Sequence, residues 1–190
     1  MEARALLDAL HTAERLKDET RHCETSGGRR ESVAEHSWRI ALMAFWMKDE
    51  FPEVNIDRVI RMCLIHDLGE CFIGDIPTFA KTAEDDAREE AALMDWVRSL
   101  PQPVSGEMEA LYREMIALQT PEARLYKAID KLEAIVQHNE SDISSWEPHE
   151  YQLNMTYADE AVAWSPVLKE LREAIRDDTK AKIAAAERQA

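Results

Sequence analysis

The sequence predicts an all-α protein of about six or seven helices, and two observations lead to this expectation. Apolar residues recur at helical spacing in nearly every segment, and no segment shows the sustained alternation that is typical of a half-buried strand. The 190 residues include only 5 Gly and 7 Pro, too few for a loop-rich or all-β design. Hydrophobic residues make up 45% of the chain, so it is long and apolar enough to bury a core.

The expected helices follow one another with short breaks between them. They cover about residues 2–18, 32–50, 56–70, 82–100, 104–118, 122–140 and 158–178. Residues 19–31 hold the only Gly-Gly pair and are expected to form a loop. Residues 141–156 are expected to be irregular, and the tail after residue 178 to fray. No repeat or linker divides the chain, so one domain is expected over residues 1–190.

Helix starts are marked by residues that satisfy free backbone N–H groups. Ser32 and Glu35 have the spacing of a capping box, in which each side chain bonds the backbone of the other residue. Asn55 is placed to cap the helix at 56–70. Pro121 stands in the first turn of the helix at 122–140, where proline is tolerated.

The charge and the cysteines exclude several classes of partner. The chain has 23 basic and 38 acidic residues, a net charge of −15, which repels nucleic acids and anionic membranes. There is no apolar run long enough to span a bilayer and no signal peptide is visible. The odd number of cysteines (Cys23, Cys63 and Cys71) without CxxC spacing is typical of reduced thiols in a cytoplasmic protein.

The stretch LIHDLGECFIGDIPT, residues 64–78, concentrates ionisable residues after an apolar run. His66 and Asp67 are adjacent, Glu70 follows four residues after His66, and Asp75 follows eight after Asp67. Unpaired charge in a protein core is costly, and a divalent metal ion would compensate for it. His nitrogen and carboxylate oxygen are suitable ligands for such an ion.

Two residues distant in sequence could complete the metal site. His36 shares a buried helix face with Ile40 and Met43, and Asp130 lies at the edge of the apolar stripe of its helix. Taken singly, each residue has a simpler interpretation: His36 and His66 could be core histidines. Asp67 could pair with Arg58 or Arg61, and Asp130 with Lys127 or Lys131. Together the four give two nitrogen and two oxygen ligands, leaving open positions for water and substrate.

The order His36…His66-Asp67…Asp130 resembles that of the HD-domain metal-dependent phosphohydrolases. The segments RRESVAEHSWR, HDLGE, GDIPT and KAIDKLEA resemble the 5′-deoxynucleotidase branch of this superfamily, over about residues 15–140. The resemblance implies a single helical HD domain, with residues 141–190 packed on its core. It also implies hydrolysis of (deoxy)ribonucleoside 5′-monophosphates, and a homodimer.

The resemblance implies one divalent ion (Co, Mn, Zn, Ni, Fe or Mg) held by His36, His66, Asp67 and Asp130. It assigns Glu70 to proton transfer at the metal-bound water and Arg21 to orienting the phosphate, so both would be catalytic. It places the segment Asp75, Ile76, Pro77 and Thr78 against the nucleotide, with His36 and Asp130 also at the substrate. His22 stands where relatives carry Trp, which leaves its contact with base or sugar open.

The residues themselves agree with much of this assignment. Hydrolysis of a phosphomonoester needs a Lewis acid, a nucleophilic water and a proton donor for the leaving oxygen. Glu70 lies four residues after His66, on the same face of the expected helix, although an exposed acid at a helix end is the alternative. Asp75 follows Gly74 in a turn, and could also be a simple turn residue.

Basic side chains are needed to bind phosphate, and four are candidates. Arg21, Arg29, Arg30 and Lys81 lie near the motifs, and surface arginine is the alternative for each Arg. No His lies between Asp67 and Asp130, which favours one metal ion over two. His138 and His149 are interpreted as non-ligands outside the site.

Two other functions stay open. The first is an HD hydrolase of another phosphate ester or anhydride, such as a nucleoside triphosphate or an alarmone, which would release pyrophosphate or tripolyphosphate. The second is a non-catalytic nucleotide-binding module, which would require a decayed site, whereas every ligand position here is filled.

Overall fold

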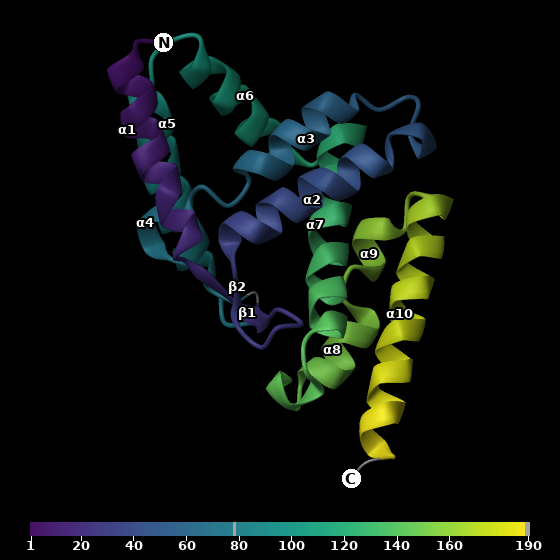
Figure 1. Ribbon diagram of the computed structural model, residues 1–190. Coiled ribbons are helices and arrows are strands. Elements are labelled where there is room, and N and C mark those ends of the chain that lie inside the picture. Colours follow the sequence, from purple (N-terminus) through teal and green to yellow (C-terminus); the bar gives the residue numbers. More distant parts are fainter. Residues whose placement is uncertain (78, 189–190) are drawn as a thin grey trace.

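The computed structural model describes residues 1–77 and 79–188, and Figure 1 shows mainly helices, with a small two-stranded hairpin in the lower part of the view. The strands are β1 (Thr20–Glu24) and β2 (Arg30–Ser32). The helices are α1 (Ala3–Ala13), α2 (Val33–Trp46), α3 (Ile56–Ile65), α4 (Glu70–Ile73), α5 (Ala83–Ser99), α6 (Val104–Ala117), α7 (Pro121–Glu140), α8 (Glu150–Thr156), α9 (Asp159–Val162) and α10 (Pro166–Glu187). Seven of the described helices have ten or more residues, so the all-α prediction is confirmed.

The predicted helix starts are confirmed. The Ser32 side chain accepts from the backbone N of Glu35, and the Glu35 carboxylate accepts from the backbone N of Ser32, which completes the capping box. The Asn55 side chain accepts from the backbone N of Arg58 at the start of α3. Pro121 occupies the first turn of α7. These caps set where α2, α3 and α7 begin, and all three helices carry residues of the site.

The loop prediction for residues 19–31 is wrong, because this segment forms an antiparallel hairpin. Thr20 lies opposite Ser32, and Glu24 lies opposite Arg30. Gly28 adopts a positive φ of 76° in the turn, a conformation that glycine reaches without strain. Strands of five and three residues are too short to show a convincing alternation in sequence. The hairpin places β1 against α7 (Figure 1).

The helix predicted at 56–70 is divided. It ends at Ile65, and α4 begins at Glu70. Between them the backbone tightens into turns of three residues, with bonds from Leu68 N to Ile65 O and from Glu70 N to Asp67 O. As a result, His66 and Asp67 lie in a turn at the end of α3 rather than inside a continuous helix.

The C-terminal predictions also need correction. The segment predicted to be irregular, 141–156, contains α8. The helix predicted at 158–178 is divided into α9 and α10, and α10 continues to Glu187, so the tail is helical there. Ser165 and Pro166 explain the division, because Ser165 caps α10 and Pro166 occupies its first turn.

The core lies where α2, α3 and α7 pack together in the middle of Figure 1. Its largest fully buried apolar side chains come from these three helices and α10: Ile40, Met62, Leu125, Ile129, Leu132, Ile135 and Leu168. Helix α10 packs on α7 and α8, while α5 and α6 lie on the other side of the molecule. Among the described helices, none combines the length and the apolar character that crossing a bilayer would require.

Candidate functional site

The structure brings the four predicted metal ligands together. His36 comes from α2, His66 and Asp67 from the turn after α3, and Asp130 from α7. His36 Nε2 lies 3.2 Å from Asp130 Oδ1, and His66 Nε2 lies 2.9 Å from Asp67 Oδ2 and 3.7 Å from Asp130 Oδ1. Ligand atoms of His36, His66 and Asp67 all lie within 4.8 Å of one another. Three helices that are distant in sequence therefore converge on one small volume.

The surroundings of His66 show whether the space between the four predicted ligands suits a cation. Its Nδ1 lies 2.9 Å from the carbonyl oxygen of Cys63, an acceptor only, so Nδ1 carries a hydrogen and Nε2 is the nitrogen left for a metal ion. That nitrogen faces carboxylate oxygens, which are also acceptors. His66 Nε2 and Asp67 Oδ2 are buried and have no hydrogen-bond partner. A divalent cation would satisfy both atoms, so the residues present fit a metal ion.

His36 is held by an acid that sequence reasoning missed. Its Nδ1 is hydrogen-bonded to Glu133 Oε2, and both side chains are fully buried. Burial and Arg21 lower the pKa of His36, but hydrogen bonds to Asp130 and Glu133 outweigh them and raise it to about 9. The signal was available in the sequence, because Glu133 lies three residues after Asp130 and therefore on the same helix face.

The sequence also allowed simple ion pairs for Asp130 and Asp67, and the structure gives a different answer for each. Asp130 does pair with Lys127, whose Nζ lies 2.7 Å from Oδ2, while Oδ1 remains directed at the histidines. Arg58, named as an alternative partner of Asp67, bonds Glu114 on α6 instead. The cation near Asp67 is Arg21, with Nη1 at 3.6 Å from Oδ2.

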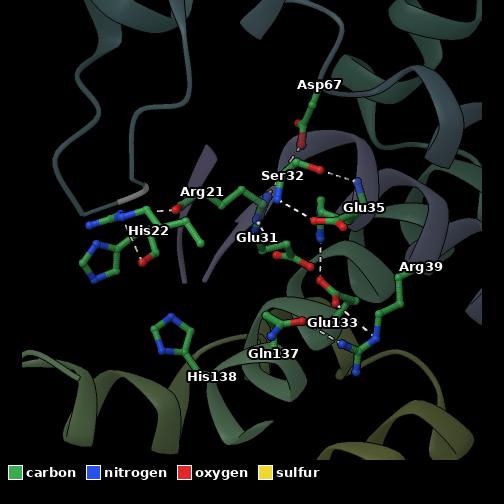
Figure 2. A network of polar contacts seen from close by, with 12 residues as sticks. Arg21, His22, Glu31, Ser32, Glu35, Arg39, Asp67, Glu133, Gln137 and His138 are labelled. Atoms are coloured by element: carbon green, nitrogen blue, oxygen red, sulfur yellow. Dashed lines mark hydrogen bonds and ion pairs between the residues drawn. The ribbon is translucent and has the colours of Figure 1, made fainter. Parts of the chain in front are cut away.

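Arg21 lies on β1, where the sequence suggested a loop, and its side chain is only 15% exposed. It approaches two acids, Asp67 and the buried Glu31, whose Oε2 lies 3.3 Å from Arg21 Nε (Figure 2). The other two candidate arginines are elsewhere. Arg29 pairs with Glu35 on the surface, and Arg30 donates to the backbone oxygens of Arg21 and His22.

Glu70 begins α4 and is 7% exposed, so it is not an exposed acid at a helix end. Because the helix breaks at residue 65, its position four residues after His66 does not place the two on one continuous helix face. Burial, Asp67 and Asp75 raise the pKa of Glu70 to about 11. Without a metal ion this raised pKa favours the protonated carboxyl, and the buried Oε2 of Glu70 has no hydrogen-bond partner.

Asp75 follows the sharp turn at Gly74, where φ is 82°. Its backbone N donates to Glu19 Oε1 at 3.0 Å, which holds the segment after α4 against the residue that precedes β1. Burial is the largest effect on the Asp75 carboxyl and raises its pKa.

These residues line one cavity of about 400 Å³, a size suited to a small ligand. The predicted residues that line it are Arg21, His22, Asp67, Glu70, Asp75, Ile76, Pro77, Lys81 and Asp130. Lys81 Nζ is engaged by Glu89 at 2.6 Å and by Asp86 at 3.2 Å. Thr78 lies outside the described residues. His36 and His66, the two histidines of the metal set, are buried and are not among the residues that line the cavity.

Other residues at the cavity were not expected. His138, interpreted from sequence as lying outside the site, is part of the cavity wall. Glu150 from α8 and Phe79 also line it, and neither was singled out. Glu150 could not be found by pattern, because it belongs to the segment that was predicted to be irregular.

Comparisons with known proteins agree with this arrangement. Residues 13–172 match the sequence model of a family described as HD domain. The human 5′-deoxynucleotidase HDDC2 is 32% identical over 154 residues, covering 79% of this chain and 74% of that protein. The bovine 5′-deoxynucleotidase HDDC2 is 36% identical over 112 residues, covering 58% of this chain and 54% of that protein.

A comparison with solved structures finds a similar fold over nearly the whole chain. The crystal structure of a predicted metal-dependent phosphohydrolase from Magnetospirillum magnetotacticum MS-1 superposes with a TM-score of 0.79 at 30% identity. The match covers 94% of this chain and 93% of that protein, so the likeness extends through the C-terminal helices.

Proposed function

The chain belongs to the HD domain family, and we propose that it is a metal-dependent phosphohydrolase that releases phosphate from deoxyribonucleoside 5′-monophosphates. The names of the relatives support this activity. The observation that carries it is the close pair of buried atoms His66 Nε2 and Asp67 Oδ2, which lie 2.9 Å apart without a hydrogen bond, with Asp130 Oδ1 at 3.7 Å from the same nitrogen and a cavity beside them. Such a pair calls for a cation next to a space that holds a small ligand.

We propose that one divalent ion is held by His36, His66, Asp67 and Asp130. Two nitrogen and two oxygen donors suit Mn, Fe, Co, Ni or Zn. When bound, the ion supplies a Lewis acid for the phosphate oxygens and lowers the pKa of a water ligand. The protein keeps the donors in register through the contacts of Glu133 with His36 and of the Cys63 carbonyl with His66.

Arg21 is assigned to binding the phosphate. Its guanidinium borders the cavity and lies 3.6 Å from Asp67, so it faces the position where the phosphate would meet the metal site. A guanidinium binds two phosphate oxygens at once, which fixes the orientation of the group as well as its charge. Lys81 and Lys127 border the same cavity and add positive charge to an otherwise acidic protein.

Glu70 is assigned to protonating the leaving group. When the P–O bond to the sugar breaks, the 5′ oxygen leaves with a negative charge that a proton must neutralise. The raised pKa of Glu70 keeps a proton on its carboxyl at neutral pH, and its position at the cavity lets Oε2 deliver that proton. The segment of Asp75, Ile76 and Pro77 borders the cavity on the same side and is assigned to the sugar.

The test is phosphate release across a panel of nucleotides. Purified protein, stripped of metal and then supplied with Mn, Co or Zn, is expected to release inorganic phosphate from dAMP and dTMP. Release of pyrophosphate or tripolyphosphate from triphosphates instead would support the alternative activity. Absence of any hydrolysis with every metal and nucleotide would leave a binding module and refute the proposed activity.

We also propose that residues 1–190 form one HD domain and that the protein assembles as a homodimer. The C-terminal segment packs on α7 through α10 and contributes Glu150 to the cavity, which supports one domain. The dimer is supported by apolar side chains exposed on α2, where Trp38 is 61% and Trp46 is 70% exposed. Light scattering on the wild type and Trp46→Glu is expected to show a dimer that weakens in the variant.

For the compartment we propose the cytoplasm. Cys23, Cys63 and Cys71 are free and buried, and reduced thiols are the rule where glutathione and thioredoxin act. Fractionation of cells that express the tagged full-length protein tests this, and recovery outside the cytoplasmic fraction would refute it.

A further inference from the structure

A second cluster of ionisable groups borders the cavity beyond the metal-binding residues. Glu150 of α8 directs Oε1 toward two imidazoles, with His22 Nε2 at 3.1 Å and His138 Nε2 at 3.5 Å. The histidines come from β1 and α7, so three elements distant in sequence meet here. All three residues line the cavity. None of them is a member of the metal set or of the predicted catalytic pair.

The polar atoms of this cluster are incompletely satisfied. His22 Nε2, His138 Nδ1 and Glu150 Oε1 are buried, and none has a hydrogen-bond partner of good geometry. The amide nitrogen of Asn154, one turn after Glu150 and also in the cavity wall, is in the same condition. Buried polar groups are normally hydrogen-bonded, so four such atoms around one cavity indicate a ligand that completes them.

Glu150 itself is too deeply placed to be the main contact. It is 1% exposed, and its Oε2 already accepts from the backbone N of Glu147 at 2.7 Å. That bond anchors the carboxylate and leaves Oε1 for the imidazoles. The arrangement is that of a positioning residue, which orients His22 and His138 while they present their remaining atoms to the cavity.

Aromatic rings extend the same wall. The His22 and His138 rings lie 6.2 Å apart, and Phe79 meets His22 edge to face at 5.4 Å. Phe79 is 48% exposed, and His149 packs on its other side at 4.5 Å. Flat ring surfaces interspersed with a few polar atoms are the usual surroundings of a heteroaromatic ring, which stacks on the former and hydrogen-bonds to the latter.

The His22–His138–Glu150 cluster borders the same cavity as Arg21, the residue assigned to the phosphate. Figure 2 shows the His22 and His138 rings together, while Asp67 lies toward the other end of the Arg21 side chain. Arg21 and His22 are neighbours on β1, so the residue assigned to the phosphate is followed directly by the first residue of the cluster. A nucleotide whose phosphate lies at Arg21 would place its base beyond it, along this wall.

We propose that His22 and His138 bind the nucleobase of the substrate and that Glu150 is the residue that positions them. The proposal rests on the proposed function, because it names the part of the substrate that the far end of the cavity receives. It also explains how a histidine can stand at position 22: its ring is held by a carboxylate and packs on Phe79.

The tautomers follow from the carboxylate. Glu150 Oε1 lies 3.1 Å from Nε2 of His22 and 3.5 Å from Nε2 of His138, and a carboxylate oxygen there favours the tautomers that carry the hydrogen on Nε2 and leave Nδ1 as an acceptor. His138 Nδ1 then offers an acceptor and Asn154 offers N–H donors to the ligand. Each natural base carries a donor next to an acceptor on one of its edges, so all are bound. We therefore expect strong dependence on the presence of a base and weak discrimination among bases.

The experiment compares dAMP with 2-deoxyribose 5-phosphate, which has the same phosphate ester but no base. In the wild type, kcat/KM is expected to be higher for dAMP. Glu150→Gln preserves shape but removes the charge, and is expected to lower kcat/KM for dAMP about tenfold, mainly through KM. The same variant is expected to leave hydrolysis of 2-deoxyribose 5-phosphate unchanged. His138→Asn is expected to act in the same direction.

Glu160→Gln is the matched control, because Glu160 is exposed on α9 and its removal changes the net charge equally. It is expected to leave both substrates unaffected. Equal losses on both substrates in Glu150→Gln would reveal a merely structural role and overturn the proposal. Unchanged kinetics on dAMP in both Glu150→Gln and His138→Asn would overturn it as well.

Calorimetric binding of 2′-deoxyadenosine, which has no phosphate, separates this proposal from the proposed function. The wild type is expected to bind it, and Glu150→Gln to bind it about tenfold more weakly. Binding that depends on Glu150 in a protein that hydrolyses no nucleotide would retain the base site and refute the enzyme activity. Phosphate release that does not depend on the base would support the enzyme activity and refute the base site.

Discussion

Glu133 accepts a hydrogen bond from Nδ1 of His36 across the contact between α7 and α2. One turn earlier in α7, Asp130 faces the other nitrogen of the same ring. A single helix therefore engages both ring nitrogens of His36, and the residue that fixes the ring is not itself among the proposed ligands. Arg39 Nε lies 3.4 Å from the second oxygen of Glu133, so the acid is held on both sides.

Glu133→Gln is expected to weaken metal binding without removing any ligand. An amide of the same shape carries no negative charge to attract the Nδ1 hydrogen. Nε2 of His36 therefore gives its electron pair to a metal ion less readily. Loss of such a contact typically lowers metal affinity about 10–100-fold. Competition with a fluorescent chelator measures the affinity directly.

The control for this variant is Glu140→Gln. Glu140 also pairs with Arg39, at 2.7 Å, but it is exposed and lies away from His36. Metal affinity in the control is expected to match the wild type. If both variants bound metal as the wild type does, the orienting role of Glu133 would be wrong.

Metal removal is expected to destabilise the protein as well as to inactivate it. Without a cation, acceptor atoms of His66, Asp67 and Asp130 face one another in a buried space. An ion present at 100 times its Kd stabilises the fold by about 2.7 kcal/mol, which in a chain of this size raises Tm by roughly 5–10 °C. Thermal unfolding with chelator and after readdition of Mn or Co measures the difference, and an unchanged Tm would contradict it.

The sequence predicted the parts of the site that local pattern reports. Ser32 and Glu35 form the expected capping box, and His36 lies one turn later on the face that the apolar spacing predicted to be buried. His66 and Asp67 were singled out because charged residues after an apolar run need a partner. These inferences succeed because capping and burial depend on neighbours within about one helical turn.

What the sequence could not predict depends on contacts between distant elements. Glu150 belongs to a segment predicted to be irregular, and its burial becomes apparent only when α8 is placed against the rest of the fold. The break after Ile65 replaced helical periodicity with a tight turn, which changed how Glu70 reaches the cavity. The hairpin was missed because its strands are too short to show a period of two.

Arg21→Lys is expected to preserve folding but impair catalysis. A lysine keeps the positive charge beside Glu31 and Asp67, so neither acid is left without a cation. It cannot donate two parallel hydrogen bonds to a phosphate, and the orientation of the substrate is lost. We expect kcat/KM for dAMP to fall about tenfold or more, since charge-assisted hydrogen bonds contribute about 1.5–3 kcal/mol.

Arg30→Lys serves as the control, because Arg30 is a surface residue whose side chain donates to backbone oxygens of β1. Steady-state kinetics of the two variants should differ, with the control close to the wild type. Equal activity of Arg21→Lys and the wild type would remove Arg21 from the phosphate site.

Glu70→Gln is expected to lower activity and raise the stability of the metal-free protein. The amide has the shape of the protonated acid but no proton to give, so kcat should fall about 10²–10⁴-fold. The folded-state pKa of Glu70 is raised from 4.5 to about 11, mainly by burial and then by Asp67 and Asp75. The folded protein therefore holds a proton that the unfolded chain releases above pH 4.5, and the stability of the wild type falls as the pH rises from 4.5 toward 11.

Glutamine does not titrate, so the variant escapes this loss. The two proteins are expected to have similar Tm at pH 4.5, and the variant an increasingly higher Tm at pH 6, 7 and 8. Thermal unfolding of both metal-free proteins across that range measures the difference, while phosphate release from dAMP measures kcat. A variant that kept full activity would exclude Glu70 as the proton donor. A Tm difference that did not grow with pH would mean that the acid is ionised in the fold, because Glu70 is the one titrating group by which the two proteins differ.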